Sequence, residues 1–252
     1  MSKVIAFAGK GGVGKTTVAA LVVRHLSRND KTPILAVDAD PNSNLGETMG
    51  LDVPTTIGDI RENFMRDPQG VPSGMDKINY IETLVEQALI EKPQFDLLVM
   101  GRQEGQGCYC MVNNILNNFT EKLSVNYNYL VVDNEAGMEH LSRRTSGDVD
   151  MLYLVTDYSL RGLRAVKRIH DMLDSLNLKI GNLGIVVSRG PEELSQAFID
   201  EVEEIGLPIM GVIPDDPALL DFDMERKSLL DLPDDSLSVK AIESMLKETC
   251  PA

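Results

Sequence analysis

Short runs of apolar residues alternate along the chain with segments of helical periodicity. The runs are nearly continuous in Val, Ile and Leu, which is typical of strands that helices cover on both faces. We predict strands at residues 4–8, 33–37, 95–100, 129–133, 151–155, 183–187 and 209–213. Strands that alternate with helical patterns are typical of βαβ units and of a mostly parallel sheet. The pattern therefore predicts an α/β fold, with a doubly wound sheet flanked by helices.

The clearest helical pattern covers residues 160–176, where apolar side chains recur three or four positions apart. Arg161, Arg164 and Arg168 lie on another face of the same predicted helix. A further helix is predicted at residues 17–26, directly after a glycine-rich segment. Each predicted helix follows a predicted strand, as the fold class requires.

Two other segments give weaker signals. Residues 52–74 contain several Gly, Pro and Asp residues, so we expect irregular structure with a helical turn near residues 60–65. Residues 239–246 are weakly amphipathic and predict a helix that packs on the rest of the chain. No repeat or long linker divides the sequence, so residues 1–252 are predicted to form a single domain.

Charge and composition exclude several classes of partner. The formal net charge is −15, whereas a nucleic-acid-binding protein needs a concentrated basic face. No apolar run reaches the length of a membrane span, no polybasic tract is present to hold an anionic membrane, and the first residues do not form a signal peptide. We therefore expect a cytoplasmic protein without nucleic-acid or membrane partners. In that compartment cysteines are typically reactive or metal-binding rather than paired in disulfides.

A glycine-rich segment follows the first predicted strand and reads Gly-Lys-Gly-Gly-Val-Gly-Lys-Thr-Thr over residues 9–17. It fits the spacing of a Walker A phosphate loop, in which backbone N–H groups and a helix N-terminus surround phosphates. Lys15 is expected to reach the β- and γ-phosphates, and Thr16 to ligate Mg²⁺. A glycine-rich turn without ligand is the alternative, but the strand, the helix and the Lys-Thr pair favour an ATP site. The predicted nucleotide-binding residues here are Gly11, Gly12, Val13, Gly14, Lys15, Thr16 and Thr17.

Aspartates end two of the predicted strands. Asp38 and Asp40 follow the second strand, and Asp133 ends the strand at residues 129–133. Because the carboxyl ends of parallel strands line the ligand crevice, we expect these carboxylates beside the phosphate loop. Asp133 resembles the Walker B aspartate, which holds Mg²⁺ through water, and Asp38 is expected to support the same ion. Helix capping or turn formation is the alternative role for each.

A second lysine in the loop, Lys10, gives the segment a particular resemblance. Lys-Gly-Gly-x-Gly-Lys-Thr-Thr resembles the deviant Walker A class, which includes MinD, ParA and the nitrogenase iron protein. The resemblance implies hydrolysis of ATP to ADP and phosphate within a homodimer that sandwiches two nucleotides. It further implies that Lys10 reaches the partner's phosphates and that Asp40 positions the attacking water, so that Lys10, Lys15 and Asp40 form the catalytic set. A lysine exposed at a loop tip is the alternative for Lys10.

Base recognition departs from the pattern of this class. An Asn usually follows the strand at residues 183–187, but Ser188 and Arg189 stand here. Ser188 offers a single hydroxyl, so the amide contact to adenine is either lost or remade by the backbone. The segment beginning at Pro214 resembles the second base-contacting loop. The resemblance thus implies base contacts from Ser188, Pro214 and Asp216.

Two cysteines one residue apart, Cys108 and Cys110, lie in a glycine-flanked segment. Two sulfur atoms cannot complete a four-coordinate metal shell, but a symmetric dimer supplies four. Zn²⁺, Ni²⁺ or an iron–sulfur cluster would suit four thiolates, and composition does not choose among them. The alternative is two cysteines that only pack, since cysteine is often a small core residue.

This Cys-x-Cys, together with Met100-Gly101 and residues 136–143, resembles the CooC/AcsF group of accessory ATPases. The resemblance implies Ni²⁺ or Zn²⁺ at Cys108 and Cys110 of a homodimer, and a client nickel enzyme, carbon monoxide dehydrogenase or acetyl-CoA synthase. Glu139 and His140 belong to the pattern of the group without an assigned role. His140 is either a metal ligand or a hydrogen-bonded structural histidine.

The resemblance therefore implies an ATP-dependent metallochaperone that inserts nickel into one of those enzymes. One alternative is a positioning ATPase like MinD or ParA, which needs a basic face or a membrane-binding tail. The other is an ATPase like the nitrogenase iron protein, which carries a [4Fe–4S] cluster but draws its cysteines from separate loops.

Overall fold

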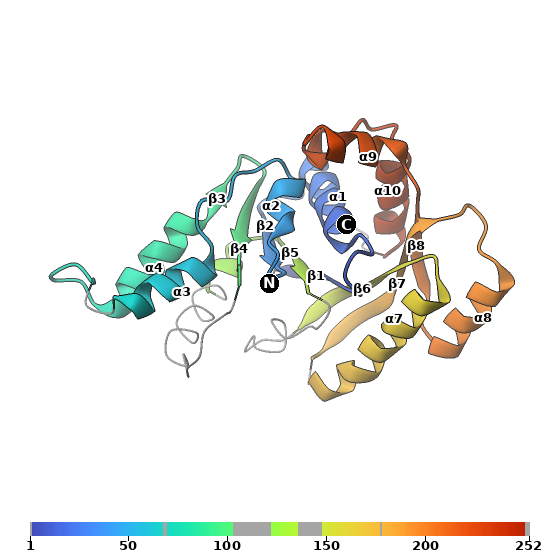
Figure 1. Ribbon diagram of the computed structural model, residues 1–252, viewed down its shortest axis with the longest axis horizontal. Coiled ribbons are helices and arrows are strands. Elements are labelled where there is room, and N and C mark those ends of the chain that lie inside the picture. Colours follow the sequence, from blue (N-terminus) through green and yellow to red (C-terminus); the bar gives the residue numbers. More distant parts are fainter. Residues whose placement is uncertain (1, 68–69, 103–121, 136–147, 177, 250–252) are drawn as a thin grey trace.

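The structure is a computed structural model that describes residues 2–67, 70–102, 122–135, 148–176 and 178–249 (Figure 1). Its centre is an eight-stranded sheet. The strands are β1 (Lys3–Ala8), β2 (Ile34–Ala39), β3 (Ile90–Glu91), β4 (Phe95–Val99), β5 (Tyr129–Asn134), β6 (Val149–Asp157), β7 (Ile180–Gly190) and β8 (Ile209–Pro214). Their order in the sheet is β3-β4-β2-β5-β1-β6-β7-β8.

The sheet is parallel except at one edge, where β3 pairs antiparallel with β4. The predicted α/β fold with a doubly wound, mostly parallel sheet is confirmed. All seven predicted strands are present, and β6 and β7 are longer than predicted, at 9 and 11 residues. The two-residue β3 was not predicted, because so short a strand has no recognisable periodicity.

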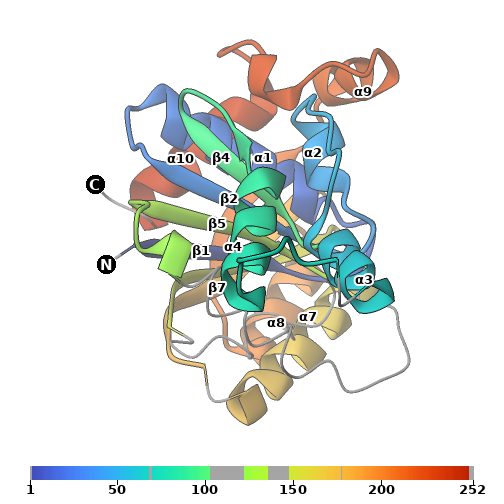
Figure 2. The same cartoon turned by 90° about the vertical axis from the view of Figure 1, so that its left-hand side faces the viewer.

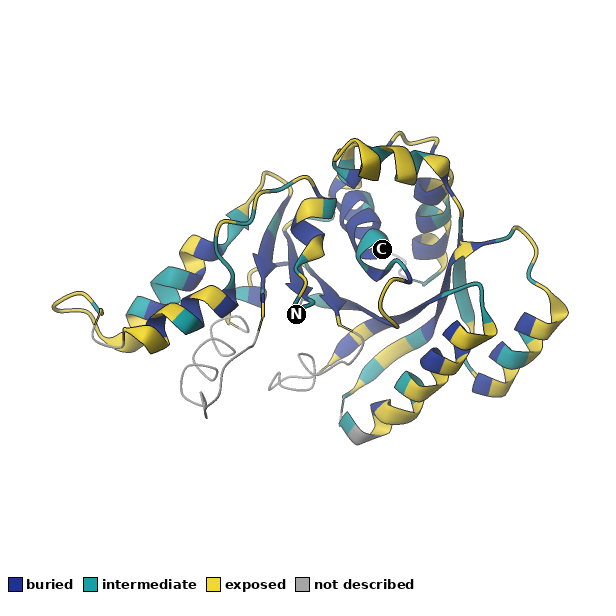
Figure 3. Cartoon of the chain, viewed as in Figure 1, coloured by how far each residue is buried: buried dark blue, intermediate teal, exposed yellow. Residues whose placement is uncertain are grey.

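Helices cover both faces of this sheet. They are α1 (Lys15–Arg28), α2 (Asn44–Thr48), α3 (Ile57–Arg66), α4 (Lys77–Ala88), α7 (Leu160–Leu173), α8 (Gln196–Ile205), α9 (Pro217–Met224) and α10 (Leu237–Thr249). Both views place α1, α9 and α10 on one side of the strands and α7 and α8 on the other (Figures 1 and 2). Two apolar cores result, one with α1 and α10 and one with α3, α4, α7 and α8. Buried residues accordingly run through the central strands (Figure 3).

Helix α3 corrects one prediction. The expected irregular segment contains a ten-residue helix in place of a single turn. Its start is fixed by a capping box, in which the Asp59 N–H donates to Thr56 Oγ1 (3.1 Å) and the Thr56 N–H donates to Asp59 Oδ2 (2.8 Å). Ile57, Ile60 and Phe64 are buried in the core, so tertiary packing holds a helix that the local composition disfavours.

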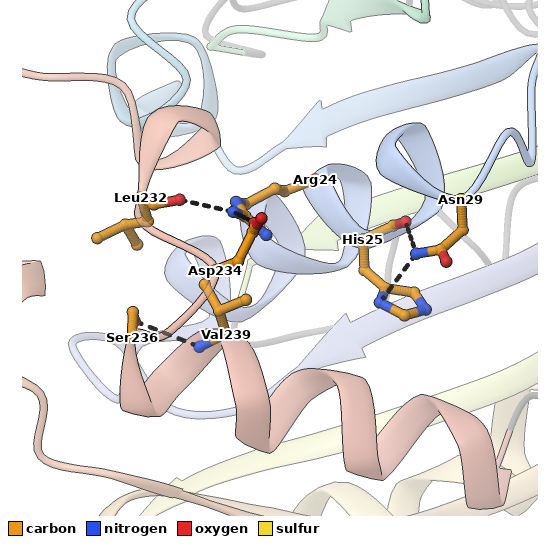
Figure 4. Close-up of polar contacts among 7 residues, drawn as sticks. All are labelled: Arg24, His25, Asn29, Leu232, Asp234, Ser236 and Val239. Carbon is orange, nitrogen blue, oxygen red and sulfur yellow. Dashed lines mark hydrogen bonds and ion pairs between the residues drawn. The ribbon is translucent and has the colours of Figure 1, made fainter.

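Helices α1 and α10 lie side by side and are joined by a buried arginine. Arg24 of α1 is 5% exposed, and its Nη2 atom donates to the Leu232 carbonyl (2.6 Å) and to the Asp234 carboxylate (2.5 Å) (Figure 4). Both acceptors lie in the segment that leads into α10, where the Val239 N–H donates to the Ser236 hydroxyl (3.4 Å). Arg24 thus bonds α1 to the segment that precedes α10, and α10 packs on the rest of the chain as predicted for residues 239–246.

The order of the strands indicates where a ligand would bind. The chain leaves β1 toward β2 on one side and returns to pair β6 on the other side of β1. Ligands of such sheets bind where the strand order reverses, at the carboxyl ends. The glycine-rich loop follows β1 at this point. Within the described part of the chain, no helix is long and apolar enough to cross a membrane.

Candidate nucleotide-binding site

The glycine-rich loop between β1 and α1 has a backbone that other residues would not tolerate. A Cβ atom on Gly9 would lie 2.2 Å from the Val155 carbonyl oxygen of β6. Gly12 and Gly14 adopt φ angles of 79° and 94°, in the left-handed region that glycine reaches at no steric cost. Helix α1 then begins at Lys15 without a side-chain cap from any described residue, and the N–H groups of the first turn of such a helix can bind an anion.

The two lysines of this loop lie in different environments. Lys15 is buried, and its Nζ atom donates to the Lys10 carbonyl (3.4 Å), which holds the side chain back across the loop. Lys10 is exposed, and no described residue pairs with its ammonium group. An exposed cation at the loop tip is what a cross-subunit role requires, although that role stays a prediction.

Asp133 is the penultimate residue of β5 and lies in register with Asp38 of β2. Asp133 is 1% exposed, and apart from the nearby Thr16 hydroxyl its carboxylate oxygens face no hydrogen-bond donor among the residues that the structure describes. Burial raises the pKa of Asp133 to about 7, while the nearby Thr16 hydroxyl lowers it and the Asp38 carboxylate raises it further. A divalent cation between Thr16 and Asp133 would supply the missing positive charge, so the donor set fits Mg²⁺.

Asp38 is also buried, but its oxygens are occupied. Oδ1 accepts from the Asp40 N–H (3.1 Å) and Oδ2 from the Leu45 N–H (2.8 Å). Burial raises the pKa of Asp38 to about 6, against the effect of these two hydrogen bonds. The carboxylate therefore organises the loop after β2, and its support of Mg²⁺ stays a prediction.

Asp40 lies in that loop and is partly exposed. Its Oδ1 atom accepts from the Asn42 N–H and from Asn42 Nδ2, both at 2.9 Å. No described residue bonds the other oxygen, which leaves it available to a water molecule. An oxygen placed in this way could orient the attacking water, and that role of Asp40 stays a prediction.

The strand end that was expected to contact a base lies against the phosphate loop. Ser188 of β7 is 7% exposed, and a Cβ atom on Gly14 would lie 2.9 Å from its Oγ. The next residue, Arg189, donates from Nη2 to the Gly12 carbonyl (2.9 Å). Sequence reasoning did not find this contact, since nothing in a sequence indicates which atoms a strand-end arginine reaches.

Pro214 ends β8, and Asp216 caps α9. The Asp216 carboxylate accepts from the Ala218 N–H (3.0 Å), the Ser236 hydroxyl (2.6 Å) and the Ser238 N–H (2.9 Å). Burial acts to raise the pKa of Asp216, but the hydrogen bonds from Ser236, Ser238 and Ala218 outweigh it, and the pKa lies below its usual range. The side chain thus fixes the loop that follows β8, and contact of Pro214 or Asp216 with a base stays a prediction.

The predicted metal-binding residues Cys108 and Cys110 lie outside the described residues, as do Glu139 and His140. Among the residues that the structure does describe, no three His, Cys, Asp or Glu side chains form a group that could hold a metal ion. A metal site at the cysteine pair therefore remains a prediction from sequence.

A phosphate loop at the strand-order reversal, with buried carboxylates at the neighbouring strand end, defines the class of P-loop nucleotide-binding proteins. Within this class the chain belongs to the CobQ/CobB/MinD/ParA nucleotide binding domain family, which it matches over residues 4–229.

Relatives extend over nearly the whole chain. An uncharacterized ATP-binding protein of Methanocaldococcus jannaschii is 39% identical over 247 residues, or 97% of each chain. The carbon monoxide dehydrogenase accessory protein CooC of Rhodospirillum rubrum is 29% identical, over 90% of this chain and 89% of that protein. A ParA family ATPase of Chlorobium tepidum TLS superposes with a TM-score of 0.71 at 23% identity, over 97% of this chain and 98% of the other. At that identity the superposition establishes the fold alone.

Proposed function

We propose that the chain is an ATPase that acts as an ATP-dependent metallochaperone, inserting nickel into carbon monoxide dehydrogenase or acetyl-CoA synthase. The observation that carries the proposal is the similarity to CooC, a carbon monoxide dehydrogenase accessory protein, along 90% of the chain. The Cys-x-Cys of Cys108 and Cys110 supplies thiolates, which are ligands for Ni²⁺ or Zn²⁺.

In the proposed reaction a water molecule attacks the γ-phosphorus of ATP. The new P–O bond forms as the bond to the β,γ-bridging oxygen breaks, the attacking water loses a proton to the solvent, and ADP and phosphate leave. Asp40 orients this water through the carboxylate oxygen that Asn42 leaves free. Lys15 neutralises negative charge on the phosphates. Bound Mg²⁺ would neutralise further phosphate charge, held by the Thr16 hydroxyl and, through water, by Asp133 with support from Asp38.

The proposed active form is a homodimer. Lys10 of each protomer reaches the nucleotide of the other, and the two cysteine pairs meet on the two-fold axis as four ligands. Closure around ATP changes the distance between the cysteine pairs, so nucleotide state and metal affinity become linked. Hydrolysis of the ATP then allows the closed dimer to open.

A metal titration tests this proposal. Ni²⁺ and Zn²⁺ are titrated calorimetrically into the wild-type protein, Cys108→Ala and Cys250→Ala. Cys250, the third cysteine of the sequence, lies outside the Cys-x-Cys and serves as the control. The assembly state is measured by size-exclusion chromatography and light scattering. We expect one metal per dimer for wild type and Cys250→Ala, and loss of both metal binding and metal-induced dimerisation for Cys108→Ala. One metal per monomer, or unchanged binding by Cys108→Ala, would reject the shared site. A brown protein with iron–sulfur absorbance would favour the nitrogenase-iron-protein alternative.

A further inference from the structure

We infer that Arg189 is a positioning residue of the phosphate loop, and that its hydrogen bond to Gly12 preorganises the loop for the nucleotide. The inference rests on the proposed binding of ATP by this loop. It adds a residue from a distant part of the sequence to those that the Walker A spacing identifies.

The contact crosses a long stretch of sequence. Arg189 follows Ser188 at the end of β7, and its Nη2 atom lies 2.9 Å from the carbonyl oxygen of Gly12, 177 positions earlier in the chain. Ser188 itself lies against Gly14, where an added Cβ atom would come within 2.9 Å of its hydroxyl oxygen. The end of β7 therefore holds the loop by a charged hydrogen bond at Gly12 and approaches it closely at Gly14, where no larger residue would fit.

The backbone of Arg189 is unfavourable for an arginine. Its φ angle of 53° lies in the left-handed region, which L-residues other than Gly, Asn and Asp seldom occupy. The pairing of β7 with β8 also shifts between Ser188 and Gly190, so the chain bulges at this residue. Strain of this kind persists at functional sites, where the surrounding structure holds it. Here the bulge aims the side chain at the loop.

Holding the Gly12 carbonyl also orients the next N–H group. In a planar trans peptide the C=O of Gly12 and the N–H of Val13 point in opposite directions. A carbonyl directed toward Arg189 therefore turns the Val13 N–H away from the guanidinium. No described residue accepts a hydrogen bond from this N–H, which is one of the predicted phosphate donors. Arg189 thus sets the direction of a phosphate donor without touching the phosphate.

Four variants test the inference. Arg189→Ala removes the guanidinium group. Arg189→Lys keeps the positive charge and can still donate a hydrogen bond, from an ammonium group in place of the guanidinium. Arg189→Gly removes the side chain but accepts the left-handed backbone, which separates the hydrogen bond from the backbone strain. Arg161→Ala is the matched control, since Arg161 is an exposed arginine at the start of α7 that pairs with no described residue. Binding of Mg-ADP and of a non-hydrolysable ATP analogue is measured by calorimetry.

We expect Arg189→Ala and Arg189→Gly each to weaken nucleotide binding about tenfold, Arg189→Lys to restore part of the loss, and Arg161→Ala to bind within about twofold of wild type. Hydrogen exchange without nucleotide gives the second measurement. Amides of residues 10–14 should exchange several-fold faster in Arg189→Ala and Arg189→Gly, which a residue that only touched bound phosphate would not change.

Several results would overturn the inference. These are wild-type affinity in Arg189→Ala or Arg189→Gly, an equal loss in Arg161→Ala, or unchanged exchange of the loop amides. If the wild-type protein bound no nucleotide, the proposed function itself would fail. If the wild type and all three Arg189 variants bound nucleotide equally well, only the role of Arg189 would be rejected.

Discussion

At the tip of β5, the carboxyl group of Asp133 lies buried beside that of Asp38, and burial raises their pKa values to about 7 and about 6. Each group binds its proton more tightly in the folded protein than in the unfolded chain, where an aspartate has a pKa near ~3.9. The folded state therefore holds more protons between about pH 4 and pH 7. Across this window, the free energy of unfolding of the protein without Mg²⁺ should fall as the pH rises.

Replacing Asp133 by Asn tests this dependence. We expect the two raised pKa values together to cost the wild type about 4 kcal/mol of unfolding free energy between pH 5 and pH 8, of which Asp133 accounts for roughly two thirds. Asp133→Asn should lose much less, because its amide does not ionise, and the exposed control Asp52→Asn should follow the wild type. Urea denaturation at the two pH values, without nucleotide or Mg²⁺, measures the difference. Equal slopes for wild type and Asp133→Asn would contradict the assigned environment.

Two other substitutions separate nucleotide binding from hydrolysis. Lys15→Ala should weaken ATP binding by about a hundredfold or more, because a buried ammonium group no longer faces the phosphates. Asp40→Ala should bind ATP within a few-fold of wild type and hydrolyse it at least about a hundredfold more slowly, because the attacking water loses its orienting carboxylate. Calorimetry and single-turnover phosphate release measure the two effects. Wild-type turnover by Asp40→Ala would show that another group positions the water.

Residues of the site differ in how far the sequence could predict them. The loop at residues 9–17 has the spacing of a phosphate loop between a strand and a helix, and Asp133 lies near the end of an apolar strand, so the positions of both in the fold could be predicted from sequence. Arg189 could not, because its contact with Gly12 depends on a bulge and on strand order. Asp216 could be placed in a loop, but its capping hydrogen bonds to Ser236 and Ser238 depend on a segment about twenty residues later.

Among the elements, α1 joins the phosphate loop to the C-terminal helix through Arg24 (Figure 4). Arg24→Met keeps the unbranched stem of the side chain but leaves the buried Leu232 carbonyl without its donor, and should lower the free energy of unfolding by about 1 to 3 kcal/mol. Asp234→Asn should have little effect, because that carboxylate is 80% exposed and water screens the ion pair. Urea denaturation of both variants makes the comparison. An equal loss for the two would mean that the ion pair, and not the carbonyl contact, holds the helices together.

Elements with continuous or periodic apolar patterns were predictable, and the others were not. The central residues of the strands and helix α7 could be predicted from the pattern. Strands buried on both faces require continuous apolar residues, and a helix buried on one side requires apolar residues three or four positions apart. Helix α3 was missed because Gly, Pro and Asp residues surround it, although Thr56 and Asp59 have the spacing of a capping box. Helix α4 was not predicted either, yet Asp76 caps it by accepting from the Ile78 and Asn79 N–H groups.

The charge of the whole molecule bears on the proposed homodimer. Two chains of net charge −15 repel each other, and salt screens that repulsion over a Debye length of about 10 Å at 0.1 M. Lys10 is an exposed cation at the predicted interface, and ATP adds negative charge there. We expect ATP-dependent dimerisation to strengthen as the salt concentration rises from low to moderate values.

Lys10→Ala tests the cross-subunit role. The variant should bind ATP within a few-fold of wild type, because Lys15 and the loop backbone remain, but should stay monomeric when ATP is added. Arg161→Ala removes a positive charge outside the loop and should dimerise like wild type. Light scattering with a non-hydrolysable ATP analogue at two salt concentrations gives the assembly states. Normal dimerisation of Lys10→Ala would place this lysine outside the interface.

The proposed metal site and nucleotide site should be coupled through the dimer. Four thiolates on the two-fold axis require two chains, so bound Ni²⁺ or Zn²⁺ favours the dimer, and a nucleotide sandwich favours the same state. Linkage then requires that ATP change the affinity for metal and that metal change the affinity for ATP by the same factor. We expect a factor of about 5 to 150 from calorimetric titrations of each ligand with and without saturating amounts of the other. Lys10→Ala should retain metal binding but lose the coupling, whereas Cys110→Ala should retain ATP binding and lose both metal and coupling. Metal and ATP that bind independently in the wild type would leave two unconnected sites, and the metallochaperone would then need another means of releasing its ion.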